Sequence, residues 1–283
     1  MKRFRDFFMY EGEWYSRAYV ADWLVVCTMW ILGWIINFLP VYERGFSIHD
    51  PSISLPKKHN QIGGWVNFIL ATIIPLFFIL ALGTYRKSLI DIHHGSIALL
   101  ATRGLAALVT VCLKHSVGRL RPDFLARCKW DKNLEECIGK ADSILEGRKS
   151  FPSGHASTAF AGMTFLALFL AGQMSAWRFD APVKPGAVRS SRMVRLSLTF
   201  FPLAFATYVA ITRLEDHRHH EEDIIVGSLI GILSACIFYI LYWTSPFDLR
   251  DTTQPRLLYT NRGDVQLTRN TEFELTSQDV ESV

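Results

Sequence analysis

Three histidines and several carboxylates stand close together in the stretch TRLEDHRHHEEDIIVG, residues 212–227. His219 and Asp223 are four residues apart, so on a helix their side chains would face each other. A carboxylate beside an imidazole fixes the tautomer of the ring and stabilises the imidazolium that forms during a reaction. Arg213 adds a cation six residues before His219. The pattern is typical of a histidine prepared for nucleophilic or acid–base chemistry.

Another histidine opens a long apolar run in the stretch EGRKSFPSGHASTAF, residues 146–160. Pro152 is tolerated at a helix start because its missing N–H would be unpaired there. Ser153 and Gly154 would then lie in the first turn, where free N–H groups and the helix dipole attract an anion. Glycine lets that anion approach the backbone closely. We therefore predict an anion site with His155 beside it; the alternative is an ordinary helix cap with an interfacial histidine.

Basic residues gather in the stretch KHSVGRLRPDF, residues 114–124. Lys114 and Arg121 are seven residues apart, close to two helical turns, which places both cations on one helix face. Pro122 disfavours helical geometry at Arg121 and is expected to end the helix there. Arg119 supplies a third cation. The alternative is a basic cluster that anchors the chain to lipid headgroups.

The histidine-rich stretch also permits a metal site. The candidate ligands are His217, His219, His220, Glu222 and Asp223. Their spacing matches no ordinary zinc pattern such as HExxH, and a solvated polar loop is the plainer alternative. The sequence shows no clear acidic cage for Mg²⁺ either, so we predict neither a metal nor a cofactor.

Long apolar segments separate these stretches. Of the 283 residues, 50% are hydrophobic, and the charged residues, 20% of the chain, are clustered. A spanning helix needs about 20 apolar residues, and six segments approach that length: 23–41, 65–83, 95–113, 156–174, 197–212 and 224–243. We therefore predict an all-α integral membrane bundle of six transmembrane helices over 23–243. An N-terminal segment, 1–22, and a polar, disordered tail, 244–283, flank it.

The number of spans decides which loops share a membrane face. With six spans both termini lie on one side, and loops 42–64, 114–155 and 213–223 share the other. All three chemical stretches therefore meet at one face of the membrane. Basic residues in 1–22 and 175–196 favour cytoplasmic termini, which makes the active face lumenal or extracellular, in an endomembrane or the plasma membrane.

Together the three stretches would supply at least three cations, a helix N-terminus and two separate histidines. Phosphoryl transfer requires this combination, because its transition state spreads negative charge that cations and backbone donors stabilise. One histidine can attack phosphorus, and the other can protonate the leaving oxygen. The net charge of +4 is modest, so a nucleic-acid partner is not predicted.

The chain resembles the lipid phosphate phosphatases, the integral-membrane type 2 phosphatidic acid phosphatase family. The family pattern Lys-x6-Arg-Pro is met over 114–122, and Pro-Ser-Gly-His is met over 152–155. The third pattern, Ser-Arg-x5-His-x3-Asp, is met over 212–223 except that Thr212 replaces the usual serine and keeps its hydroxyl. The flanking sequences GRLRPDFLARC and EGRKSFPSGH look most like the fungal and plant branch, which includes diacylglycerol pyrophosphate phosphatases.

The resemblance implies a role for each matched residue. His219 would be the nucleophile that forms a phosphohistidine, Asp223 would orient it, and His155 would protonate the departing group. The phosphate would be held by Lys114, Arg121, Ser153, Gly154 and Arg213. The family needs no Mg²⁺. The expected substrates are membrane lipid phosphates: phosphatidic acid, diacylglycerol pyrophosphate or lysophosphatidic acid.

Alternatives stay open at this stage, because the motifs recognise phosphate and not the rest of a substrate. A polyprenyl diphosphate or a soluble phosphate ester would also fit. Arg103 within the third apolar segment faintly favours a non-enzymatic transporter of a phosphate-bearing solute; we expect instead that it pairs with polar groups of the bundle.

Cys128 and Cys137 share a loop of the active face, so a disulfide between them is predicted if that face is lumenal or extracellular. The sequence sets neither the preferred lipid nor the oligomeric state.

Overall fold

The computed structural model describes residues 17–178, 191–248, 253 and 255–256. These residues include six helices long and apolar enough to cross a membrane. They are α2 (Arg17–Ile36), α3 (Gly64–Arg86), α4 (Leu89–Val117), α7 (Gly154–Met174), α8 (Arg192–Glu215) and α9 (Glu221–Tyr242). The predicted all-α bundle of six membrane-spanning helices is confirmed. Most of the predicted tail, 244–283, and of the N-terminal segment, 1–22, lies outside the described residues.

Several helices extend beyond the apolar runs that predicted them. The first begins at Arg17 and not near residue 23, and α8 continues from Arg192 to Glu215. Helical hydrogen bonding continues into polar flanks that a hydropathy reading does not count. Side-chain caps mark two starts: Ser88 Oγ accepts the N–H of Asp91 at 3.2 Å, and Ser191 Oγ accepts that of Val194 at 3.5 Å.

The basic stretch leaves its helix earlier than expected. α4 ends at Val117 and not at Arg121, because Gly118 caps it in the left-handed conformation, with φ 56°. A Cβ at this position would lie 1.9 Å from the carbonyl oxygen of Tyr42, so glycine also admits a neighbouring segment. Arg121 therefore does not share a helix face with Lys114, and the connection after α4 determines its position.

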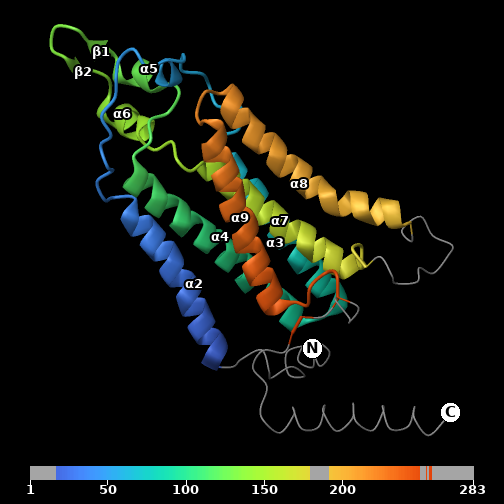
Figure 1. Ribbon diagram of the computed structural model, residues 1–283. Coiled ribbons are helices and arrows are strands. Elements are labelled where there is room, and N and C mark those ends of the chain that lie inside the picture. The colour runs from blue at the N-terminus through green and yellow to red at the C-terminus, as the bar shows by residue number, and fades with distance from the viewer. Residues whose placement is uncertain (1–16, 179–190, 249–252, 254, 257–283) are drawn as a thin grey trace, which may run out of the picture.

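Helix α7 lies inside the bundle, between α3, α4, α8 and α9 (Figure 1). It is the most deeply buried of the six spans. At Gly227 and Gly231 of α9, an added Cβ would lie 2.5 and 2.6 Å from carbonyl oxygens of Ser153 and Ser157 on α7. Such close approach of backbones is typical of small residues between membrane helices. The two helices run in the same direction, and their N-terminal ends lie side by side.

The connections at one end of the bundle fold together, where α5, α6 and the strands lie (Figure 1). Their elements are the 3₁₀ helix η2 (Pro51–Ile53), α5 (Phe124–Cys128), α6 (Ala141–Gly147) and the antiparallel strands β1 (Trp130–Asp131) and β2 (Glu136–Cys137). The Leu55 N–H donates to the carbonyl of Pro122 at 2.9 Å, and the Ser153 N–H donates to that of Asp223 at 2.8 Å. Loops 42–64, 114–155 and 213–223 therefore share one face, which confirms the prediction from the number of spans.

The predicted disulfide joins Cys128 and Cys137, tying the end of α5 to strand β2. Beside it the buried Asp123 accepts hydrogen bonds from Arg127 at 2.8 Å and Arg218 at 3.3 Å. Arg218 belongs to the α8–α9 connection, so this carboxylate fastens that connection to the loop between α4 and α7.

Arg103 is held by polar groups of the bundle, as expected. Its Nε donates to the Thr72 hydroxyl at 3.2 Å, and its Nη1 donates to the carbonyl of Thr158 at 3.3 Å. The guanidinium also lies 5.9 Å from the centre of the Phe68 ring. These contacts connect α4 to α3 and α7 and give the charge a structural role.

Candidate active site

The start of α7 has the cap and the free N–H groups that the predicted anion site requires. Ser153 is the N-cap residue, and its Oγ accepts the N–H of Ala156 at 3.3 Å. Pro152 precedes this cap and does not occupy the first helical position that we expected. First-turn N–H groups of a helix have no acceptor within the helix, so those of Gly154 and His155 are available to a ligand.

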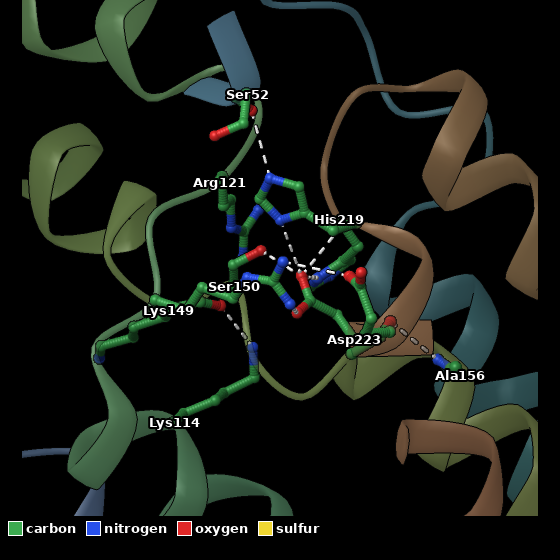
Figure 2. A network of polar contacts seen from close by, with 12 residues as sticks. Ser52, Lys114, Arg121, Lys149, Ser150, Ala156, His219 and Asp223 are labelled. Carbon is green, nitrogen blue, oxygen red and sulfur yellow. Dashed lines mark hydrogen bonds and ion pairs between the residues drawn. The ribbon is translucent and has the colours of Figure 1, made fainter. Parts of the chain in front are cut away.

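Lys114 reaches this helix start from α4. A Cβ added at Gly154 would lie 3.5 Å from Lys114 Cε, so the lysine side chain passes directly beside the glycine. The ammonium group donates to the carbonyl of Lys149 at 2.6 Å (Figure 2). The structure thus brings together the predicted cation of one stretch and the predicted helix N-terminus of another.

Arg121 lies nearby although it has left the helix. Its side chain is largely buried, and its guanidinium donates to the carboxylate of Glu146. Its backbone N–H donates to the carbonyl of Gly147 at 2.8 Å, which holds the residue against the end of α6. Sequence reasoning did not single out Glu146; the only available signal was its place in the same polar loop.

Arg213 is held at the end of α8. Its Nη2 donates to Asp216 Oδ2 at 2.7 Å, and its Nε and Nη2 donate to the Thr212 hydroxyl at 3.1 and 2.9 Å. The threonine oxygen therefore acts as an acceptor for the guanidinium, a contact that any hydroxyl at this position can make. Asp216 was missed in the sequence, although an acid three residues after an arginine at a helix end is a recognisable pair.

His219 lies outside a helix, contrary to expectation. Helix α9 begins at Glu221, with His220 as its N-cap residue and Asp223 as its third residue. Even so, His219 Nδ1 lies 3.7 Å from Asp223 Oδ2, so the predicted pair does face each other. The same oxygen accepts the N–H of His220 at 3.0 Å. The pairing therefore depends on the cap of α9 and not on helical periodicity.

The neighbouring residues His219 and His220 have different surroundings. His220 Nε2 lies 3.2 Å from the carbonyl of Ser52, and its Nδ1 lies 3.4 Å from Asp223 Oδ2, so both ring nitrogens have partners. His219 is buried and lies in the field of Arg121 and Lys114. Burial and those two positive charges lower the pKa of His219 below its ordinary value, although Asp223 opposes them.

His155 lies in the field of the same cations. The charges of Arg213, Arg121 and Lys114 act on its imidazole. The ring hydrogen-bonds to the backbone of Ile62, and among the described residues its Nε2 has no hydrogen-bond partner. Both imidazoles therefore lie near one group of cations although they come from different elements.

One hollow is lined by residues of this site, and a second lies farther along α7. An open pocket of about 550 Å³ is lined by His219 and Arg119, together with residues of η2 and the start of α9. A second hollow, of about 430 Å³, is lined by apolar side chains of α3, α7 and α8. Within the part of the chain that the structure describes, no three metal-binding side chains gather closely enough to hold an ion.

The chain is similar to known proteins over most of its length. Residues 95–247 match the PAP2 superfamily. The chain is 31% identical over 271 residues to lipid phosphate phosphatase 2 of Arabidopsis thaliana, covering 90% of this chain and 89% of the relative. It is 31% identical over 235 residues to diacylglycerol pyrophosphate phosphatase 1 of Saccharomyces cerevisiae, covering 78% of each. It is 33% identical over 218 residues to phospholipid phosphatase 2 of Mus musculus, covering 69% of this chain and 75% of the relative. No solved structure matches significantly.

Proposed function

Because the chain belongs to the PAP2 superfamily and matches lipid phosphate phosphatases over most of its length, we propose that it removes phosphate from membrane lipids. It is an integral, multi-pass membrane protein. The observation that carries the proposal is the meeting of His219 and Asp223 with Lys114, Arg121 and the start of α7. The expected substrates are phosphatidic acid, diacylglycerol pyrophosphate and lysophosphatidic acid.

The proposed reaction uses the two imidazoles in sequence. His219 attacks phosphorus with Nε2 while its Nδ1–H faces Asp223. The new N–P bond forms as the P–O bond to the lipid breaks, and His155 gives its proton to the departing oxygen. His155 then takes a proton from water, whose oxygen attacks the phosphohistidine. Inorganic phosphate leaves, and both histidines return to their starting states.

The cations stabilise charge that develops on the phosphoryl oxygens. Lys114 and the Gly154 N–H group lie at the helix start, and Arg121 and Arg213 approach from other segments. In the free protein Arg121 is paired with Glu146, so a bound phosphate would replace that carboxylate as the partner of the guanidinium. Four donors of this kind can serve the transition state without a metal ion.

The apolar hollow supports a lipid substrate over a soluble ester. Apolar side chains line it, and its lining on α7 runs from Met163 to Met174, so it begins about 14 Å along the helix from Gly154. A substrate with its phosphate at the helix start can therefore keep an acyl chain beside the same helix. The names of relatives, lipid phosphate phosphatase and diacylglycerol pyrophosphate phosphatase, support the same substrate class.

We further propose cytoplasmic termini and a lumenal or extracellular active face. The basic residues of 175–196 support this orientation. The disulfide between Cys128 and Cys137 lies on the active face, and disulfides persist in oxidising compartments.

Replacement of the nucleophile tests the proposal. We expect His219→Ala to lower phosphate release from phosphatidic acid in detergent micelles by at least about 1000-fold. His59→Ala is the matched control: it removes an exposed imidazole from the loop before α3 and is expected to keep most of the activity. Wild-type activity in His219→Ala would contradict the proposal. A transporter would instead keep its flux without this histidine.

A further inference from the structure

The carboxylate of Asp223 is held from three directions. It is fully buried. Its Oδ1 accepts from Arg119 Nη1 at 2.8 Å, and its Oδ2 accepts from Ser150 Oγ at 2.5 Å. The His220 N–H donates to Oδ2 as well, at 3.0 Å. These donors fix the plane of the carboxylate and therefore the direction in which its oxygens point.

Arg119 and Ser150 are also joined to each other. The Ser150 N–H donates to the carbonyl of Arg119 at 2.9 Å, and the Ser153 N–H donates to the carbonyl of Asp223 at 2.8 Å. The result is a closed network between the chain after α4, the chain before α7 and the first turn of α9 (Figure 2). Removal of either side chain would open it.

We propose that Arg119 and Ser150 are positioning residues that hold Asp223 with its Oδ2 towards His219, and so aim the nucleophile at phosphorus. The proposal rests on the proposed role of His219. Asp223 Oδ2 is 3.7 Å from His219 Nδ1, a separation that a small rotation of the carboxylate would change. Neither Arg119 nor Ser150 occupies a fixed position of the three family patterns.

Charge gives Arg119 a second effect on the nucleophile. The charged and titratable groups around this network are Lys114, Arg119, Arg121, Glu146, Lys149, His155, Arg213, His220, Glu222 and Asp223. Asp223 attracts a proton to His219, and the ion pair with Arg119 weakens that attraction. Without Arg119 the imidazole would bind its proton more tightly, and a protonated histidine cannot attack phosphorus. A loss of Arg119 is therefore expected to raise the pKa of His219.

Arg119→Gln tests the proposal, with Lys132→Gln as the control. Lys132 is an exposed cation in the β1–β2 turn on the same face. With phosphatidic acid in micelles, we expect Arg119→Gln to lower kcat by about 100-fold with little change in KM. The acidic limb of the kcat–pH profile should move to higher pH. Arg119→Lys should recover part of the kcat and part of the wild-type pH profile. Lysine restores the positive charge but cannot bond Asp223 and Glu222 at the same time as the guanidinium does.

Ser150→Ala provides an independent test, because it removes a neutral donor and leaves every charge in place. It should lower kcat while moving the acidic limb less than Arg119→Gln does. Size-exclusion chromatography in detergent identifies the variants that fold. If Arg119→Gln does not fold, the kcat of Ser150→Ala tests the proposal. A higher KM with unchanged kcat in Arg119→Gln would overturn the proposal, since Arg119 would then bind substrate. The proposal would also be overturned if Arg119→Gln lowered kcat but left the acidic limb of the kcat–pH profile at its wild-type pH. Activity in His219→Ala would instead refute the proposed function.

Discussion

At the scale of the residue, burial keeps His219, the proposed nucleophile, in its neutral form. The attacking imidazole has to be neutral, and burial disfavours the charged form. Arg121 and Lys114 act in the same direction, whereas Asp223 opposes them, and the net effect lowers the pKa of His219. The folded protein therefore releases the proton from His219 at a pH where the unfolded chain still binds it. The contribution of this residue to stability is present above about pH 6.5 and is lost as the pH falls below it.

The lowered pKa of His219 predicts reactivity at acidic pH. Carbethoxylation by diethyl pyrocarbonate requires a neutral imidazole, and the pH dependence of its rate does not involve ionisation of a substrate. We expect the midpoint for modification of His219, followed by mass spectrometry of its peptide, to lie below pH 6.5. The exposed His59 is the internal comparison in the same experiment. A midpoint for His219 above 6.5 would contradict the prediction.

At the scale of the element, two parallel helices set the geometry of the site. α7 supplies Ser153, Gly154 and His155, and α9 supplies Asp223. Their first turns lie together because Gly227 allows the backbone of Ser153 to come close. A larger residue at this glycine would separate the anion site from the carboxylate that faces the nucleophile.

Gly227→Leu is therefore expected to damage activity more than its distance from the chemistry suggests. A Cβ at this position would meet Ser153 O at 2.5 Å and Ala156 Cβ at 3.3 Å. We expect a loss of about 1–3 kcal/mol in unfolding free energy and of about 100-fold in phosphate release. The matched control is Gly64→Leu at the start of α3, where the space is open. Thermal unfolding in detergent and phosphate release are measured for both variants. Equal stability and equal activity of Gly227→Leu and Gly64→Leu would contradict a role for the close approach of α7 and α9.

At the scale of the whole molecule, the site depends on the two spans that separate each of its three loops from the next. Three connections meet at one end of the bundle, and the disulfide and the Asp123 ion pairs fasten the loop between α4 and α7 over that end. The substrate phosphate therefore meets the protein at one membrane face, which we propose is lumenal or extracellular.

Glycosylation checks this orientation. Glu135→Ser completes an Asn-Leu-Ser acceptor at Asn133 in the β1–β2 turn, and Gly263→Thr completes an Asn-Arg-Thr acceptor at Asn261 in the C-terminal tail. In a eukaryotic secretory host, we expect a glycosidase-sensitive mass increase for the first variant and none for the second. The reverse pattern would place the active face in the cytoplasm.

The sequence by itself determined the six spans and the common face of the three motifs. Hydrophobic length is a local property, and the sidedness of the loops follows from counting spans. The matched patterns also identified Lys114, Arg121, Arg213 and both imidazoles, which the structure brings near one another.

Only the tertiary structure decided how these groups are held. Arg119, Ser150 and Asp223 meet across separations of 73 and 104 residues, and no local pattern predicts such contacts. Beyond the end of α4, Arg121 is held by the carboxylate of Glu146 and the carbonyl of Gly147. The physical reason is common to these contacts: packing between distant segments sets which donor meets which acceptor.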